Sequence, residues 1–255
     1  RALEAHRDSF CTLAISITLS AHSRSSARGG AEGATWTVRA DGAAGACDGA
    51  GATPPSPVIA ANVEAIAVST IAWLAASETT IVVPVYQRQY RWDIGGCEQL
   101  LSDVRAVSAA DATDTHFIGS ILSTAASDDT ESGAHLVLID GQQRLTTLFL
   151  LHWYLAQRDG ELAAFAQLFC NANGSARFAY SVRPSSSEFF DALSQHAPSP
   201  ALGADDSLIE HLTDQPWYFR HWRLDPTIQS CLTMLQAMHE RFHNAATARF
   251  ARLID

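Results

Sequence analysis

The fold is decided by the stretch His135–Arg158, with the sequence HLVLIDGQQRLTTLFLLHWYLAQR. Its opening, HLVLID, is a short apolar run that predicts a β-strand. Gly141 then lets the chain turn. The residues after it predict a long helix, with the following side chains directed inward: Leu145, Leu148, Phe149 and Leu155. The stretch therefore predicts a strand that leads directly into a long helix.

Three segments before this stretch extend the same unit. Thr79–Val85 is rich in β-branched residues and is ended by Pro84, which predicts a strand. Asp93 can cap a helix, because the residues behind it place these apolar side chains on one face: Cys97, Leu100, Leu101, Val104 and Val107. Phe117–Ser123 predicts another short strand. The order strand, helix, strand, strand, helix indicates a compact mixed α/β unit over residues 58–158.

Residues 159–255 have a more helical character. Phe178–Val182 alternates apolar and polar residues, and Ser185-x-x-Glu188 matches a capping box that would open a helix. Asp225-Pro226 predicts an N-cap followed by proline at the first helical position. The helix behind it has apolar residues at the spacing of one face: Ile228, Cys231, Leu232, Leu235, Met238 and Phe242. The chain is therefore predicted to be α+β, with a small mixed α/β domain followed by a mainly helical extension.

The first part of the chain has a different composition. Residues 1–57 are rich in Ala, Gly, Ser and Arg and end in Pro54-Pro55-Ser56-Pro57, which predicts a poorly ordered leader. One apolar run within it, Phe10–Leu19, is too short to span a bilayer. Asn62–Ala76 follows the leader, has apolar residues at roughly helical spacing, and so predicts a helix.

The net charge restricts the partners of the protein. The formal charge is −10. Residues 1–60 contain five Arg and five acidic residues and sum to zero, so the whole negative charge lies on residues 61–255. Such an acidic body repels a phosphate backbone, which argues against broad non-specific binding to nucleic acid. Any phosphate contact must therefore come from a local patch.

Two residue types argue against further classes of site. All 17 basic residues are arginine, and a Walker-type phosphate loop needs a lysine that this chain lacks. The five cysteines are scattered without paired spacing, which argues against a zinc knuckle and against a disulfide framework. We therefore expect a cytoplasmic protein without membrane contact.

The strongest local signal for chemistry is Asp140-Gly141-Gln142-Gln143-Arg144, which follows a strand and opens a helix. Backbone N–H groups at a helix start are unpaired and attract anions. Arginine there is unfavourable by about 0.3–1 kcal/mol unless an anion is near, so Arg144 indicates a phosphate partner for its bidentate fork. Asp140 can hold Mg²⁺ or position an attacking water, and Gln142 and Gln143 can orient a water or read a base edge. A structural role is an equal alternative, because Asp140 as N-cap with Gln143 three residues later is a capping box.

A second signal is the segment Tyr86-Gln87-Arg88-Gln89-Tyr90-Arg91-Trp92. It contains two guanidinium groups and three aromatic rings, and no acid, within an otherwise acidic body. Arginine suits phosphate groups, and aromatic rings stack on bases. A packing role is the open alternative, with Arg88 paired to Asp140 or Asp103.

A third pattern, His239-Glu240-Arg241-Phe242-His243, matches the H-E-x-x-H motif of zinc peptidases on a predicted helix. A catalytic zinc requires a third protein ligand, and no His or Glu follows His243. His239 also falls beside the apolar stripe of this helix. We therefore predict structural histidines, with a zinc peptidase as the remote alternative.

Three phrases in the same order resemble the N-terminal domain of the GmrSD family of restriction proteins. They are VPVYQRQYRW at Val83–Trp92, FIGSI at Phe117–Ile121 and IDGQQRLTT at Ile139–Thr147. The later segments Tyr180–Ser186 and Trp217–Trp222 resemble the helical continuation of that family. The resemblance covers residues 62–255 and leaves the leader unexplained.

This resemblance implies a ParB/sulfiredoxin-like fold that binds and hydrolyses a nucleoside triphosphate (NTP), with Mg²⁺ as the expected metal. It assigns three residues to catalysis: Asp140, Gln143 and Arg144. It assigns six to nucleotide binding: Tyr86, Gln87, Arg88, Tyr90, Gly141 and Gln142. In the family this activity is coupled to recognition of modified DNA, and a separate C-terminal HNH nuclease domain, expected outside this chain, cuts the DNA.

The resulting prediction is an NTP-hydrolysing sensor module of a modification-dependent restriction system that defends against phage. A non-catalytic module that binds nucleotide or modified DNA as a ligand stays open as the alternative. A homo-oligomer is a further open alternative for its state of assembly.

Overall fold

The computed structural model describes residues 11–20, 35–38, 62–69, 80–91, 94–109, 115–126, 135–181, 183–198 and 202–253. The strands in these ranges are β1 (Cys11–Ser20), β2 (Thr35–Val38), β3 (Asn62–Ser69), β4 (Thr80–Val83), β5 (Thr115–Ala126), β6 (His135–Asp140) and β7 (Phe178–Tyr180). The helices are α2 (Ile94–Ala109), α3 (Gln142–Asp159), α4 (Leu162–Phe169), α5 (Pro184–Gln195), α6 (Leu208–Thr213), the 3-10 helix η1 (Arg220–Leu224), α7 (Pro226–Phe242) and α8 (Phe250–Leu253). No helix in the described ranges combines the length and the apolar character that crossing a membrane requires.

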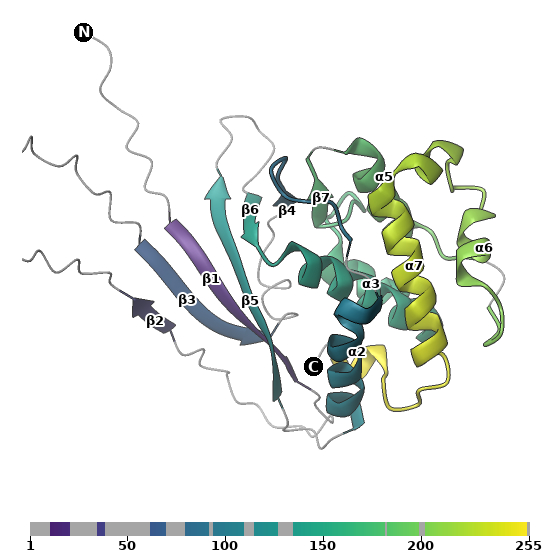
Figure 1. Ribbon diagram of the computed structural model, residues 1–255, viewed down its shortest axis with the longest axis horizontal. Coiled ribbons are helices and arrows are strands. Elements are labelled where there is room, and N and C mark those ends of the chain that lie inside the picture. Colours follow the sequence, from purple (N-terminus) through teal and green to yellow (C-terminus); the bar gives the residue numbers. More distant parts are fainter. Residues whose placement is uncertain are drawn as a thin grey trace, which may run out of the picture.

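The strands form one mixed sheet in the order β2-β3-β1-β5-β6-β4-β7. β6 pairs antiparallel with β5 and parallel with β4, and β7 adds a further parallel strand beside β4. Figure 1 shows the helices gathered on one side of the molecule around α3 and α7, next to the β4-β7 edge of the sheet. The predicted α+β class is confirmed, and the helical extension also contributes the strand β7 to the sheet.

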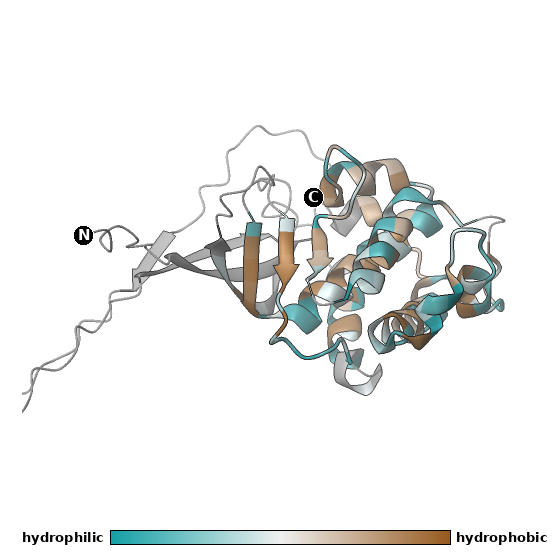
Figure 2. Ribbon diagram, turned by 90° about the horizontal axis from the view of Figure 1, so that it is seen from above, coloured by the Kyte–Doolittle hydropathy of each residue, from teal (hydrophilic) through white to brown (hydrophobic). Residues whose placement is uncertain are grey.

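The core lies around α3, which follows β6 directly and is buried along most of its length. Phe149 is at its centre, because its ring contacts four others at centroid distances of 5.2–6.1 Å: Phe165, Phe169, Phe178 and Phe190. Such ring pairs add about 0.5–1.5 kcal/mol each beyond the buried area. These rings come from α4, β7 and α5, so one aromatic cluster joins the sheet edge to the helical half. Figure 2 shows hydrophobic residues concentrated on the strands next to the helices.

Helix α7 forms as its own sequence signals predict. The residues predicted to face inward are all buried: Ile228, Cys231, Leu232, Leu235, Met238 and Phe242. The predicted N-cap is confirmed as well, because the Asp225 carboxylate accepts a hydrogen bond of 2.8 Å from the N–H of Thr227. A cap, a proline at the first position and an apolar stripe are therefore sufficient to define this helix.

One predicted helix is a strand instead. Asn62–Ser69 forms β3, which pairs parallel with β1 and antiparallel with β2. The helix predicted over Asn62–Ala76 is therefore wrong for these residues, and residues 70–76 lie outside the described ranges. The β-branched Val63, Ile66 and Val68 suit a strand, and backbone partners distant in the sequence override the short helical spacing.

Two strands, β1 and β2, lie within the predicted leader 1–57. β1 is placed between β3 and β5, and Ile15 of β1 is opposite Ile121 of β5 in the antiparallel ladder. The apolar run noted in the leader thus coincides with a strand of the sheet, which composition alone did not predict. The rest of the predicted leader is outside the described ranges, as is the predicted cap Asp93.

The capping box predicted from Ser185 and Glu188 is not formed. Helix α5 begins with a proline, and Arg183 is its N-cap residue. The hydroxyl of Ser185 donates to the Asp225 carboxylate at 2.6 Å, and Glu188 accepts from the indole N–H of Trp222 at 3.2 Å. Both side chains therefore bond to distant partners in place of the local cap.

Candidate functional site

The three phrases named above meet at the start of α3. The loop 84–91 follows β4 and bonds to the end of β6 and to the first turn of α3. From β5, Gly119 and Ser120 contact Arg144 in the same turn. Three segments that are far apart in the sequence thus form one site.

Two side chains of the loop attach it to β6. The Gln87 side-chain amide donates to the carbonyl oxygen of Ile139 at 2.7 Å, and the Tyr86 hydroxyl donates to the carbonyl oxygen of Leu138 at 3.4 Å. Both predicted nucleotide-binding residues therefore lie beside the end of β6. Tyr86 remains 66% exposed, so its ring has a face available for stacking.

Gln143 holds the same loop from the α3 side. Its Oε1 accepts a hydrogen bond from the Arg91 N–H at 3.0 Å, and its Nε2 donates to the Gln89 carbonyl oxygen at 3.1 Å. The loop backbone therefore uses both polar atoms of this amide. Gln143 therefore positions the loop, and the catalytic role predicted from the sequence stays a prediction.

Tyr90 is a core residue. Its side chain is fully buried, and its hydroxyl lies 2.7 Å from the Thr147 hydroxyl on α3. A ring without exposed surface does not stack on a ligand. Tyr90 anchors the end of the loop on α3, and the direct nucleotide contact predicted for it stays a prediction that this burial does not favour.

Arg144 extends across β5. Its Nη1 donates to the Ser120 carbonyl oxygen at 2.6 Å, and its Nη2 lies 3.9 Å from the Asp140 carboxylate. Gly119 makes room for this guanidinium, since a Cβ at that position would lie 2.3 Å from Arg144 Nη1. Arg144 thus has a structural partner, the Ser120 carbonyl oxygen. Its remaining N–H groups can donate hydrogen bonds to a phosphate.

Helix α3 begins without a side-chain cap. Gly141 is the N-cap residue, with φ of 95° in the left-handed region that favours glycine. A Cβ on Gly141 would also lie 2.9 Å from the side chain of Ile121. The capping box predicted from Asp140 and Gln143 is therefore not formed, and the first backbone N–H groups of α3 are left for an anion.

Gln142 is buried beneath this turn, with 3% of its surface exposed. Its Nε2 donates to the Tyr180 hydroxyl at 3.3 Å. Burial raises the pKa of Tyr180 well above its usual value, so this phenol stays protonated. The Oε1 atom of Gln142 is buried and has no hydrogen-bond partner among the described residues. Such an unpaired amide oxygen costs about 1–3 kcal/mol, and a bound ligand can satisfy it.

These residues surround a cavity of about 220 Å³, which we call the α3 cavity. It is bordered by all the predicted site residues except Tyr86 and Tyr90. Arg88 is exposed and forms no ion pair within the part of the chain that the structure describes, so pairing with Asp140 or Asp103 is not observed. The side chain of Asp140 is 70% exposed. The cavity thus combines an unpaired guanidinium, an exposed carboxylate and an uncapped helix start.

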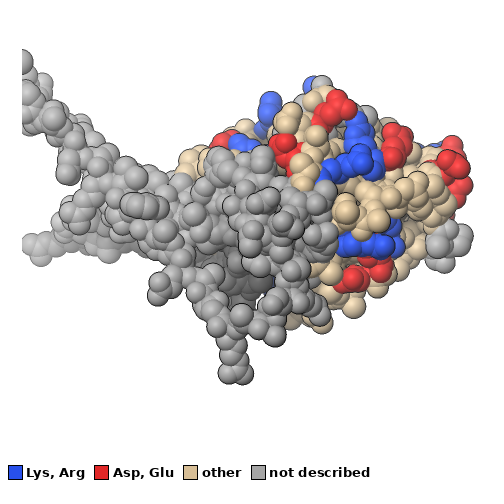
Figure 3. Space-filling view, turned by 90° about the horizontal axis from the view of Figure 1, so that it is seen from below, with Lys and Arg blue, Asp and Glu red and all other residues tan. Residues whose placement is uncertain are grey.

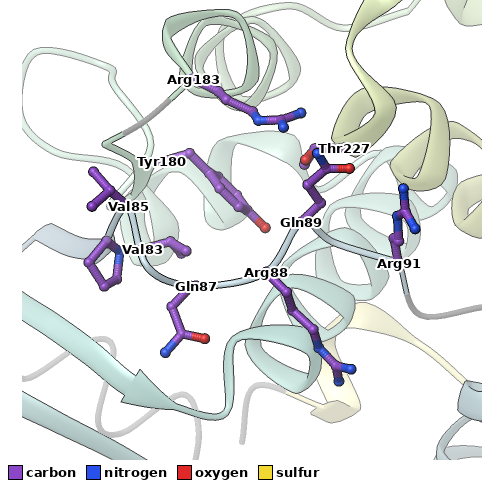
Figure 4. Close-up of a pocket in the computed structure, with 10 residues that line it drawn as sticks. Val83, Val85, Gln87, Arg88, Gln89, Arg91, Tyr180, Arg183 and Thr227 are labelled. Atoms are coloured by element: carbon purple, nitrogen blue, oxygen red, sulfur yellow. The ribbon is translucent and has the colours of Figure 1, made fainter.

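A second cavity, of about 590 Å³, lies on the opposite side of the loop 84–91, and we call it the rear cavity. In Figure 4, Gln87 and Arg88 point to one side of the loop, whereas Gln89 and Arg91 point to the other, where α5 and α7 begin. Gln87 and Arg88 border both cavities. The two cavities are therefore neighbours that adjoin at Gln87 and Arg88.

The sequence did not identify several residues of this region as site residues. Gly119 and Ser120 contact the guanidinium of Arg144. The sequence feature that could have indicated this contact is the glycine inside the strand phrase FIGSI. Tyr180 and Arg183 border the rear cavity, and their signal was the later phrase that begins at Tyr180. Thr227 borders it as well, and no feature of the sequence distinguishes it beyond its place in the first turn of a helix.

The H-E-x-x-H pattern lies at the end of α7. His239 is buried, with Nδ1 at 3.3 Å from the Tyr154 hydroxyl and Nε2 at 3.1 Å from the Gly203 carbonyl oxygen. Burial lowers the pKa of His239, so the ring stays neutral. Both ring nitrogens have protein partners, and the described residues contain no group of three His, Cys, Asp or Glu side chains placed to hold a metal. This geometry supports the structural role predicted for the histidine.

Comparison with known proteins gives one result that bears on identity. No curated protein matches the chain. A family model described as the GmrSD restriction endonuclease, N-terminal domain, matches residues 71–241. This range contains the α3 cavity and most of the helical half. The chain therefore belongs to the family of GmrSD restriction endonuclease N-terminal domains.

Proposed function

We propose that this chain is the nucleotide-responsive module of a restriction system, which binds an NTP at the start of α3 and hydrolyses it. Membership of the GmrSD family supports the restriction system. One observation carries the nucleotide assignment: the α3 cavity brings together the unpaired Arg88 guanidinium, the uncapped start of α3 and the exposed Asp140 carboxylate. This combination suits a phosphate chain with a bound metal.

The phosphate groups contact the backbone and the arginines of the α3 cavity. The N–H groups of Gln142 and Gln143 lie at the positive end of the α3 dipole, which favours an anion. Arg88 can give a bidentate pair to one phosphate, and Arg144 can give a second contact while its Nη1 stays on Ser120. A volume of about 220 Å³ is below the range of about 300–1,000 Å³ for whole small-molecule sites, so this cavity fits the phosphate end of a nucleotide.

Asp140 is the residue that would hold Mg²⁺. This ion commonly takes one or two carboxylates together with phosphate oxygens and retains several waters, so one exposed carboxylate beside a phosphate site fits it. When bound, the ion supplies neutralisation of charge on the phosphate oxygens. The residues of the chain position the ligand. Gln143 and Tyr90 hold the loop that carries Arg88, and Gly141 lets the backbone come close to the ligand.

A module that binds nucleotide without turnover is the second candidate. It is favoured by the use of both polar atoms of the Gln143 amide in holding the loop. Asp140 is then the one acidic side chain, among the described residues that border the α3 cavity, that can orient an attacking water. Hydrolysis therefore depends on Asp140 in this proposal.

The proposed link to DNA follows what the family resemblance implies. Nucleotide state is coupled to recognition of modified DNA and to an HNH nuclease domain outside this chain. Figure 3 shows arginines in separate patches with acidic residues between them on the described part of one face. Such a surface suits a local DNA contact better than broad binding to a phosphate backbone.

Phosphate release tests the proposal. ATP, GTP, CTP and UTP are each incubated with Mg²⁺ and with no DNA, unmodified DNA or modified DNA. The proteins are wild type, Asp140→Asn and the control Asp205→Asn, which changes an exposed acid outside both cavities. We expect release from at least one NTP, a loss of about 100-fold or more in Asp140→Asn, and no change in the control. Tight binding without release supports the second candidate, and absence of binding to all four NTPs contradicts both.

A further inference from the structure

The rear cavity has the size and the mixed lining of a ligand site. Its volume of about 590 Å³ lies within the range of about 300–1,000 Å³ that small-molecule sites occupy. Val83, Pro84 and Val85 at the end of β4 form an apolar wall. The opposite wall comes from the start of α5 and the start of α7, and Gln87 and Arg88 of the loop form the side where this cavity adjoins the α3 cavity.

Two buried polar atoms of this lining have no protein partner. Gln89 Oε1 and Thr227 Oγ1 are both inaccessible to solvent and form no hydrogen bond among the described residues. Thr227 as a whole is 1% exposed. An unpaired buried polar atom costs about 1–3 kcal/mol. Since such groups are rare in folded proteins, two of them beside one cavity indicate a ligand that pairs with them.

One of the arginines that border the rear cavity, Arg183, is paired with a carboxylate. Arg183 Nη1 lies 3.4 Å from Asp225 Oδ1, and the hydroxyls of Ser185 and Ser186 donate to the other carboxylate oxygen at 2.6 and 2.8 Å. Burial acts to raise the pKa of Asp225, but these hydrogen bonds, the Thr227 N–H and the Arg183 charge hold that pKa below its ordinary value. The ionised carboxylate therefore offsets the charge of Arg183, the arginine at the start of α5 that borders the cavity.

The other two arginines of this lining are Arg88 and Arg91. Arg88 borders the rear cavity, but Figure 4 shows its guanidinium directed to the opposite side of the loop. Arg91 is exposed and borders the cavity, and its flat guanidinium can stack on a ring. A flat ligand with a polar edge matches the apolar wall, the unpaired polar atoms and the guanidinium of Arg91.

We propose that the rear cavity binds the base of the nucleotide, with Gln89 and Thr227 as the residues that read its polar edge. This rests on the proposed function, in which the phosphates lie in the α3 cavity. The Gln89 amide can both accept and donate, as a base edge requires, and the Thr227 hydroxyl adds a second contact. Gln87 and Arg88 border both cavities, which puts them beside the sugar.

The same assignment connects the two ends of the ligand. Gln143 lies in the turn that binds phosphate and donates to the carbonyl oxygen of Gln89. The residue that reads the base is therefore held in place by the phosphate-binding turn itself. A base that pairs poorly with Gln89 leaves buried polar atoms unpaired, which discriminates more strongly than a loss of apolar contact.

The test compares nucleotides with a ligand that has the phosphates alone. The full chain is titrated with ATP, GTP, CTP, UTP and inorganic tripolyphosphate, as wild type, Gln89→Leu and Thr227→Val. We expect the best NTP to bind wild type at least about tenfold more tightly than tripolyphosphate. Each substitution should lower the affinity for that NTP by about tenfold and reduce the preference among the four bases. The affinity for tripolyphosphate should stay unchanged.

Control substitutions separate this effect from a general loss of structure. Gln195→Leu on α5 and Thr233→Val on α7 change exposed residues outside both cavities and should bind all ligands like wild type. Thr227→Val should not lower the melting temperature, because its hydroxyl has no hydrogen-bond partner among the described residues to lose. If Gln89→Leu does not fold, Thr227→Val decides the question by itself.

The outcomes distinguish this inference from the proposed function. Equal affinity of wild type for NTPs and tripolyphosphate overturns the base site and leaves the phosphate site standing. Unchanged NTP affinity in the folded variants overturns it as well. If wild type binds neither NTP nor tripolyphosphate, the proposed function fails and the base site fails with it.

Discussion

The Nε2 atom of Gln143 lies 3.1 Å from the carbonyl oxygen of Gln89 and donates a hydrogen bond to it. The same amide accepts the N–H of Arg91 at 3.0 Å, so a side chain of α3 provides the backbone partners of a loop that has left the sheet. This loop carries Arg88 to the α3 cavity and Gln89 to the rear cavity. This amide therefore contributes to the geometry of both cavities, together with the bonds of Tyr86, Gln87 and Tyr90.

Gln143→Leu should release the loop 84–91. It removes two hydrogen bonds, which lowers the free energy of unfolding by about 1–3 kcal/mol. Urea denaturation measures this loss, and hydrogen exchange at the Arg91 amide locates it. Gln195→Leu is the matched control, since it removes an exposed glutamine on α5. Unchanged protection of the Arg91 amide in Gln143→Leu contradicts the role given to this side chain.

Gly119→Ala should be more damaging than Gly160→Ala. Both glycines have positive φ, of 114° and 75°, and each alanine carries a backbone cost of about 1–2 kcal/mol. A Cβ at Gly119 would also meet the Arg144 guanidinium at 2.3 Å, whereas Gly160 has no atom within 4 Å. We expect a further loss of about 1–3 kcal/mol for Gly119→Ala in chemical denaturation. Equal losses for the two variants would show that Arg144 does not occupy this position.

Arg144→Gln should lower the stability of the ligand-free protein. The sequence alone predicts higher stability, because the substitution removes a cation from the positive end of a helix. The structure reverses the sign, since Nη1 donates to the Ser120 carbonyl oxygen, a contact of about 0.5–1.5 kcal/mol. Melting of the ligand-free protein and nucleotide titration of the same variant measure both roles. A higher melting temperature would rule out the Ser120 contact as a stabilising one.

Asp225→Asn should destabilise the protein in a manner that depends on pH. Although burial raises the pKa of Asp225, hydrogen bonds from Ser185, Ser186 and the Thr227 N–H, together with Arg183, hold it below the ordinary value of 3.8. A depressed carboxylate pKa stabilises the fold above that value, and the contribution is lost as the pH falls through the lower folded pKa. We expect a cost of about 1.5–3 kcal/mol near neutral pH. In urea denaturation this cost should shrink below about pH 3.8, and a constant cost would contradict the ionised state.

His239→Ala should leave phosphate release intact. Its ring nitrogens bond to the Tyr154 hydroxyl and the Gly203 carbonyl oxygen, so the cost is one of stability alone. That cost should be lower than for Leu235→Ala, a core truncation of about 2–5 kcal/mol. Metal analysis of the purified chain checks the zinc alternative directly. One zinc per chain, or a folded variant without activity, would restore that alternative.

The elements that local signals define were predictable from the sequence. α3 and α7 have apolar stripes, and α7 also has the cap Asp225 and a proline behind it. β4 and β6 are short apolar runs ended by Pro84 and by Gly141. The residues of β3 were predicted to be helical because the apolar residues of Asn62–Ala76 have roughly helical spacing. The strands that pair with β3 are distant in the sequence, so no local signal indicated them.

The candidate site was predictable as a set of residues and less so as a set of roles. The motif at the start of α3 gave the α3 cavity, because strand, glycine and helix follow one another along the chain. The roles of Tyr90 and Gln143 depend on their partners in the folded protein. Tyr90 bonds to the Thr147 hydroxyl on α3, and Gln143 bonds to the backbone of the loop. The rear cavity forms between elements that the sequence does not connect, so Thr227 had no local signal.

The central claim is that the start of α3 holds the phosphates of a nucleotide, and Arg88 tests it most directly. Arg88 has no ion pair in the described residues, so its loss should cost little stability and act on the ligand alone. Calorimetric titration with the four NTPs compares wild type, Arg88→Gln and Arg220→Gln, an exposed arginine outside both cavities. We predict that Arg88→Gln weakens NTP binding by about tenfold to a hundredfold, as loss of a charge-assisted contact should, with Arg220→Gln like wild type. Equal NTP affinity in the two arginine variants, or no NTP binding by wild type, would contradict the account.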